Sequence, residues 1–211
     1  MARHPRACAE HISFLSLSLS RIESRRFGCT NQFERMTTFL SDFPPKTVLW
    51  GLPFVFLLHN IEEAIWMYGF LPIDPSCLPL ILQPYVPDIS YRPFLLALAI
   101  VTALPFGVAS AANLDREGGW GTYTLLTFAA VFLLNVFSHV GLAVLFREYT
   151  PGFVTALLLN LPVTVYALQR AVREQWIYQR ALWSLPLTAL LLHGPVLIGL
   201  MIGVRWLLHL W

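Results

Sequence analysis

The stretch "TVLWGLPFVFLLHNIEEAIWMYGF" runs from Thr47 to Phe70 and decides the fold class. It is long enough for a helix to cross the hydrocarbon core of a bilayer, which takes about 20 residues. In lipid, only a helix or a closed barrel satisfies all of its backbone polar groups. The sequence therefore predicts a transmembrane helix, and this helix carries His59, Glu62 and Glu63 within it.

Four more apolar stretches of spanning length follow, at about Tyr91 to Ala112, Gly121 to Phe146, Pro151 to Gln169, and Leu182 to Leu208. The whole chain is 56% hydrophobic and 12% charged. Soluble domains are about half apolar and about a quarter charged. We therefore predict an all-α fold, a polytopic transmembrane helix bundle of about five spans, with the lipid bilayer as its surroundings.

Residues 1–35 differ from the rest of the chain, because they hold six arginines and no apolar run of spanning length. We interpret 1–35 as a disordered segment or a spurious N-terminal extension, with Met36 as the better start, and 36–211 as a single membrane-embedded helical domain. The cysteines at positions 8, 29 and 77 share no CxxC spacing, so they predict neither a disulfide framework nor a thiolate zinc site. The sequence has no block of Lys and Arg interleaved with aromatic residues, so it gives no indication of nucleic-acid binding.

The basic residues predict an orientation, because cytoplasmic loops of membrane proteins carry an excess of Lys and Arg. One side of the predicted bundle holds Lys46, Arg116, Arg170, Arg173 and Arg180, and the other holds Arg92, Arg147 and Arg205. We expect a multi-pass membrane protein with its N-terminus in the cytoplasm.

Polar residues lie at membrane depth in four of the predicted spans. They are His59, Asn60, Glu62 and Glu63 in the first, Asn135 and His139 in the third, Asn160 in the fourth, and His193 in the fifth. Counting about 1.5 Å per residue from each helix end places all of them between the bilayer middle and its outer half. Residues at i, i+3 and i+4 share a helix face. One convergent cluster is therefore geometrically possible.

No Lys or Arg lies at the depth of Glu62 and Glu63. Two adjacent buried carboxylates then need protons, histidinium partners or a bound metal cation. We predict a divalent metal, zinc or iron, held by His59, Glu62, His139 and His193, because histidine and carboxylate ligands suit both metals.

In this prediction Glu63 is the catalytic residue that takes a proton from the bound water. Asn135 and Asn160 are binding residues that orient the ligands. The corresponding function is a metal-dependent intramembrane hydrolase with a lipid-like or membrane-embedded substrate.

Two other classes of function fit the same residues. A proton- or cation-coupled transporter or channel component would use the carboxylates and histidines as a relay. A non-catalytic scaffold would use them only to pack helices, since histidine and asparagine also pair transmembrane helices by hydrogen bonds. Proton-coupled uptake that survives metal removal would favour the first, whereas loss of activity without loss of folding in Glu63→Gln would argue against the second.

Prolines fall inside the predicted spans, and two of them follow candidate site residues closely. Pro162 comes two residues after Asn160, and Pro195 two residues after His193. A proline inside a helix frees a carbonyl one turn earlier and bends the helix. We expect such a bend near His193 to open space beside it.

The motifs "HNIEE", "NVFSH" and "LLLNLP", in this order on successive spans, resemble the HXXEE family of uncharacterised bacterial integral membrane proteins. The resemblance covers about Val48 to about Arg173. It implies a small multi-helix membrane protein whose named motif is His59, Glu62 and Glu63, and it implies no particular activity.

The chain also has a weaker likeness to the intramembrane proteases of the CAAX-processing and bacteriocin-immunity type. Those proteins use a glutamate pair followed by an arginine, then two histidine motifs. Glu62 and Glu63 match the pair, and His139 and His193 match the histidines. Met67 stands where the arginine would be.

Overall fold

The computed structural model describes residues 43–72, 74, 76, 80, 90–114 and 118–209. The interpretation of residues 1–35 as disordered or spurious, the start at Met36, the cysteines and Arg116 lie outside these residues. Within them every regular element is helical. Five helical spans are long and apolar enough to cross a membrane. The prediction of an all-α bundle of five spans is therefore confirmed.

The first three spans are continuous helices, and the last two are interrupted by π-helical turns. The elements are α2 (Pro45–Met67), α3 (Tyr91–Ala111), α4 (Trp120–Phe146), then α5 (Phe153–Thr155), η3 (Ala156–Asn160) and α6 (Leu161–Arg173), then α7 (Gln179–Leu191), η4 (Leu192–Val196) and α8 (Leu197–His209). The predicted boundaries agree to within about four residues, the usual uncertainty at helix ends.

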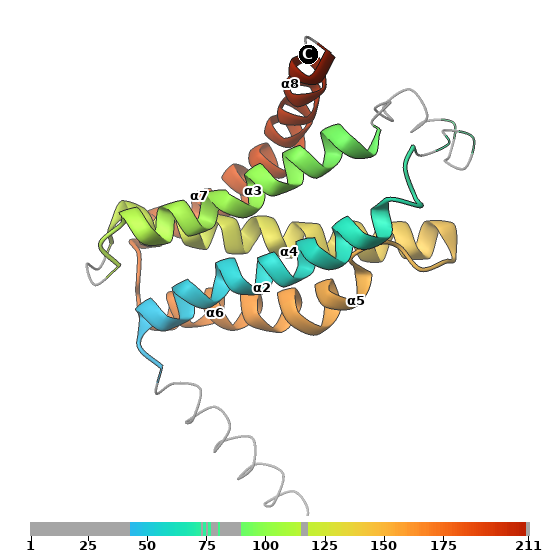
Figure 1. Cartoon of the computed structure of the whole chain (residues 1–211). Helices are drawn as coiled ribbons and strands as arrows, with labels where there is room; N and C mark the ends of the chain where they lie inside the picture. The colour runs from blue at the N-terminus through green and yellow to red at the C-terminus, as the bar shows by residue number, and fades with distance from the viewer. Residues whose placement is uncertain are drawn as a thin grey trace, which may run out of the picture. The chain divides into compact units, whose positions relative to one another are not determined.

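Both π-helical turns lie beside the prolines that the sequence singles out. Asn160 is the last residue of η3, just before Pro162, and η4 contains His193 and Pro195. A proline cannot donate the backbone hydrogen bond of a regular helix, and the wider π turn accommodates the interruption. The fifth span changes direction at η4, so that α8 leaves the line of α7 (Figure 1).

Helix α4 lies at the centre of the bundle and contacts α2, α3, α6 and α7 (Figure 1). Helix α8 packs against α3 instead. The buried apolar core gathers along one half of these helices and includes Leu49, Leu52, Leu125 and Leu126. Large apolar side chains such as Trp183 and Leu158 are exposed on the outside, as expected of helices that face lipid.

The apolar core gives way to polar residues at one level of the bundle. Phe56 of α2 and Phe132 of α4 stack with ring centroids 3.9 Å apart. One helical turn further along the same two helices come His59 and Asn135, which face each other. The bundle thus has an apolar half and a polar half, and the polar half lies towards the end of α2 and of α4.

A separate cluster holds the opposite end of the fourth span. The guanidinium of Arg170 donates two hydrogen bonds to the carboxylate of Glu174, at 2.6 and 2.7 Å. The indole N–H of Trp176 also donates to Glu174, at 2.9 Å. The hydrogen bond from Arg170 lowers the pKa of Glu174. This effect outweighs partial burial, which acts in the opposite direction. This arrangement closes the α6–α7 connection far from the polar half.

Candidate functional site

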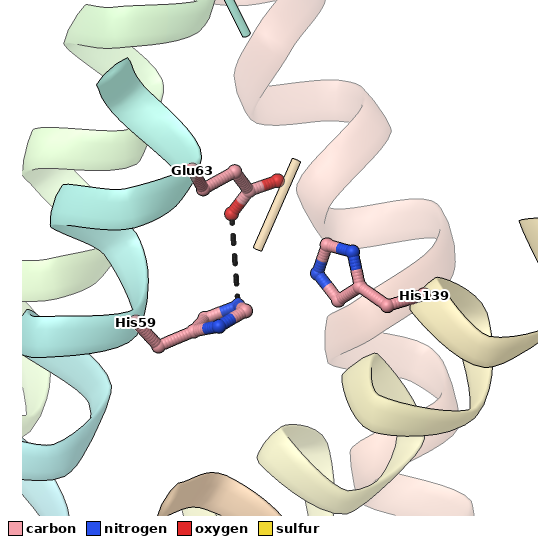
Figure 2. A group of neighbouring side chains, drawn as sticks. All are labelled: His59, Glu63 and His139. Atoms are coloured by element: carbon pink, nitrogen blue, oxygen red, sulfur yellow. Dashed lines mark ion pairs between the residues drawn. The ribbon is translucent and has the colours of Figure 1, made fainter. Parts of the chain in front are cut away.

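Three side chains from two helices meet in the polar half of the bundle. His59 and Glu63 lie one turn apart on α2, and His139 lies on α4. One ligand atom of each lies within 4.8 Å of the others. Figure 2 shows the three side chains converging on a common space between the two helices. The sequence predicts that residues of these two spans converge, and the structure brings these three together.

His59 is fully buried and is held at both ring nitrogens. Its Nδ1 lies 3.0 Å from the hydroxyl of Thr155, and its Nε2 lies 2.7 Å from Nδ2 of Asn135. The Thr155 hydroxyl in turn donates to the carbonyl of Gly152 at 3.4 Å. It therefore accepts from Nδ1–H of His59, which leaves a lone pair on Nε2. This is the tautomer that binds a metal through Nε2.

His139 is nearly as buried as His59, but its ring has no hydrogen-bond partner among the described residues. Its exposed fraction is 5%, and among the described residues neither ring nitrogen has a hydrogen-bond partner. The ring stands edge-on to that of His59, with centroids 5.0 Å apart. A buried polar group without a partner costs roughly 1–3 kcal/mol, and such groups are rare in native proteins. The ring nitrogens of His139 are therefore available to bind a ligand.

Glu63 brings a carboxylate to the same space. One of its oxygens lies 3.8 Å from Nε2 of His59, and its side chain is 13% exposed (Figure 2). Within the described part of the chain it forms no ion pair with a lysine or arginine. An isolated carboxylate in such a place is strongly disfavoured unless a cation or a proton neutralises it.

Glu62, although adjacent in sequence, points to a different partner. Its carboxylate accepts hydrogen bonds from the hydroxyl of Tyr149 and from the backbone N–H groups of Val154 and Thr155, the last at 2.8 Å. These N–H groups belong to the first turn of α5, where a helix has unsatisfied donors and favours negative charge. The side chain of Tyr149 is 43% exposed as a whole, but partial removal of its hydroxyl from water, together with the hydrogen bond to Glu62, raises its pKa to about 12. Glu62 therefore anchors the start of the fourth span.

The connection between α4 and α5 covers the two histidines. Gly152 has φ +83°, a backbone conformation that side chains disfavour. A Cβ atom built there would lie 2.8 Å from Cε1 of His59 and 2.9 Å from Cε1 of His139. Sequence reasoning missed Gly152, Tyr149 and Thr155. The turn signal "TPG" marks only the loop, and no local pattern reveals that Thr155 packs against α2.

The remaining predicted site residues lie around this group. His193, on η4, has Nε2 3.2 Å from the hydroxyl of Ser138 and lines a cavity together with Glu63 and Asn135. It does not belong to the group of three. Asn160 is fully buried, and neither its amide nitrogen nor its amide oxygen has a partner among the described residues. The functional roles predicted for His59, Glu62, Glu63, His139, His193, Asn135 and Asn160 stay predictions.

Residues 50–167 match the family described as "Protein of unknown function with HXXEE motif". The match covers more than half of the chain. The chain belongs to the HXXEE family. It is also similar to a Bacillus subtilis (strain 168) protein named "Uncharacterized protein YrkK", with 26% identity over 148 residues, which are 70% of this chain and 86% of the relative. No solved structure matches.

The HXXEE motif thus corresponds to His59, Glu62 and Glu63 on α2. The matched region also includes His139 and Thr155, which contribute to the same site, and it ends before α7, η4 and α8. His193 therefore lies outside the part of this chain that matches the family. The two glutamates of the motif face different partners. Glu62 anchors the start of the fourth span, and Glu63 lies beside two histidines.

Proposed function

We propose that this HXXEE-family chain is a metal-dependent membrane hydrolase, with a divalent cation held by His59, Glu63 and His139. The observation that carries the proposal concerns His139, which lies beside another histidine and a carboxylate. Its two ring nitrogens are buried and have no hydrogen-bond partner among the described residues. Two imidazoles and one carboxylate form a ligand set that suits zinc or iron, and catalytic sites of this kind leave a position for water.

The surroundings of His59 support the same assignment. Thr155 holds Nδ1–H, which orients the ring and leaves Nε2 to bind the cation. Asn135 now donates to that nitrogen, so its amide must turn aside when a cation binds. The amide could then present its oxygen towards a bound water. This gives Asn135 the orienting role that the sequence predicts for it.

The proposal differs from the sequence interpretation in the roles of the two glutamates. Glu63 takes the place of Glu62 as the carboxylate ligand, because its oxygen lies in the group with His59 and His139. Glu62 accepts three hydrogen bonds at the start of α5. His193 shares a cavity with Glu63, and in this proposal it carries a proton.

The proposed reaction is the hydrolysis of an ester or amide within the membrane. A divalent cation at this site would make water a nucleophile near neutral pH and would polarise a carbonyl. Water adds its oxygen to the carbonyl carbon, the bond from that carbon to the leaving oxygen or nitrogen breaks, and the protons of the water pass to the leaving group and to bulk solvent. In the proposal His193 carries the proton to the leaving group.

We also propose that the protein lies in the cytoplasmic membrane with the start of α2 on the cytoplasmic side. Lys46, Arg170, Arg173 and Arg180 lie at that end of their spans, and basic residues favour the cytoplasm. The site then lies in the outer half of the bilayer, close to the α4–α5 connection.

The direct test uses the full chain in liposomes and a 4-nitrophenyl ester of a long-chain fatty acid as the probe. We expect hydrolysis that chelation abolishes and added Zn²⁺ or Fe²⁺ restores. Glu63→Gln should lose it, whereas Glu148→Gln, which changes an exposed carboxylate of the α4–α5 connection, should retain it. Hydrolysis that survives both chelation and Glu63→Gln would contradict the proposal. Proton uptake that survives metal removal would favour a transporter instead.

A further inference from the structure

A cavity of about 180 Å³ adjoins the candidate metal ligands. It lies between α2, α3, α4 and the η4–α8 part of the fifth span. Most of its wall is apolar, and the polar side chains among the described residues that line it are Asn60, Glu63, Asn135 and His193. An apolar cavity of about 150 Å³ stays dry and binds a molecule such as benzene. This cavity therefore has room for a piece of hydrocarbon.

The cavity reaches the outer face of the bundle. Three of its lining residues, Leu104, Leu192 and Val196, are 50%, 37% and 55% exposed. On helices that cross a membrane, such exposed apolar side chains face lipid chains. A hydrocarbon chain can thus pass sideways from the bilayer into the cavity without crossing water.

The polar part of the wall mainly offers hydrogen-bond acceptors. The amide nitrogen of Asn60 donates to the hydroxyl of Thr102 at 2.5 Å. Its amide oxygen is buried and has no donor among the described residues. Glu63 adds carboxylate oxygens, and one of the two N–H groups of the Asn135 amide is used by His59. A ligand that satisfies the buried oxygen of Asn60 and the carboxylate of Glu63 must donate hydrogen bonds, so a hydroxyl or an amide N–H fits this part of the wall.

We infer that the cavity binds the hydrocarbon chain of a neutral amphiphile whose polar end carries a hydroxyl or amide N–H next to Asn60 and Glu63. The bound amphiphile represents the substrate class of the proposed hydrolase, and its role as a substrate depends on that proposed function. The binding itself does not need the metal. A chain lying in the cavity brings the polar end of the molecule to the carboxylate that we assign as a ligand.

The test uses a long-chain primary alcohol with a diazirine in its chain, and its methyl ether, which has no donor. Each probe is added to the full chain in phosphatidylcholine liposomes, irradiated, and mapped by mass spectrometry. We expect labelling of the cavity residues of α3 and α8 to saturate as the probe concentration rises. Labelling of lipid-facing residues should increase in proportion to the probe concentration. The ether should label the cavity several-fold less, and Asn60→Leu should remove this difference.

Matched variants separate the cavity from the general lipid surface. Val131→Phe fills the cavity, whereas Val144→Phe makes the same change at an exposed position of α4. Leu104→Trp enlarges a half-exposed side chain at the mouth, and Leu190→Trp is its exposed control on α7. We expect the first member of each pair to lose the saturable labelling and the second to keep it. Unchanged labelling in both Val131→Phe and Leu104→Trp would overturn the inference.

The two proposals fail in different ways. Saturable labelling of a protein that binds no metal would keep the cavity ligand and remove the hydrolase. Bound metal without saturable labelling would remove the cavity ligand and leave the hydrolase.

Discussion

His59 Nδ1 lies 3.0 Å from the hydroxyl of Thr155, a residue 96 positions further along the chain. The backbone N–H of the same Thr155 donates to Glu62 at 2.8 Å. The histidine and the first glutamate of the HXXEE motif are thus both held by one residue at the start of the fourth span. The second glutamate is left to face His59 and His139.

Replacing Thr155 by valine should weaken metal binding and leave the fold intact. The change removes the hydroxyl that orients His59, while the backbone N–H that binds Glu62 remains. Losing such an outer contact typically lowers metal affinity about 10–100-fold. Competition with a chelator of known affinity measures the effect. Thr124→Val, which removes an exposed hydroxyl on α4, is the control and should bind metal like the native chain. Equal affinities in the two variants would contradict the role of Thr155.

Gly152→Ala should disturb the site more severely. A non-glycine residue in the left-handed conformation costs roughly 1–2 kcal/mol, and the new Cβ would press against both histidine rings. We expect lower thermal stability together with loss of metal. Gly141→Ala, on α4, has nothing within 4 Å of the new Cβ. It should be neutral or slightly stabilising, because alanine is the better helix former. A Gly152→Ala protein with native stability and metal content would show that the close approach is unimportant.

The HXXEE-family fold of this chain could be predicted largely from its sequence, because lipid imposes simple rules. Each span needs about 20 apolar residues and an internally satisfied backbone. The five stretches therefore appear directly in the hydropathy. The π-helical turns were indicated only by Pro162 and Pro195, since a proline shows where hydrogen bonding fails but not how the helix adjusts.

The candidate site could be predicted only in part. Spacing on α2 put His59, Glu62 and Glu63 on one side of one helix, and composition showed that no cation accompanies them. The rotation of that helix against α4 and α5 decides which glutamate meets His139, and this rotation depends on packing between distant segments. Thr155 carries no local signal for the same reason.

We expect the fold to lose stability at alkaline pH when the hydroxyl of Tyr149 ionises. Its pKa is raised to about 12 from 10, by burial first and then by its hydrogen bond to Glu62. The protonated hydroxyl therefore stabilises the fold fully below pH 10, and this contribution is lost as the pH rises towards about 12. Melting temperatures measured across this interval should fall less in Tyr149→Phe than in the native chain. Tyr178→Phe, at a side chain that is 78% exposed against 43% for Tyr149, should fall as the native chain does. Parallel falls in all three proteins would refute the contribution of Tyr149.

Arg170→Lys separates stability from function. The variant loses the bidentate ion pair with Glu174 and the packing of the guanidinium on the rings of Tyr166 and Trp176. We expect a loss of roughly 1–3 kcal/mol in the free energy of unfolding, typical of hydrogen bonds to charged groups. Metal content should not change, because this cluster lies at the opposite end of the bundle. Exposed Arg173→Lys is the matched control and should unfold like the native chain.

Elemental analysis of the purified full chain in detergent tests whether His59, Glu63 and His139 hold a metal ion. We predict about one zinc or iron per native chain, as a site of this kind holds, and an equal amount in Glu148→Ala. His139→Ala and Glu63→Ala, folded to the same extent by circular dichroism, should contain none. A native chain without metal after gentle purification, or metal retained in His139→Ala, would show that these three residues do not form a metal site.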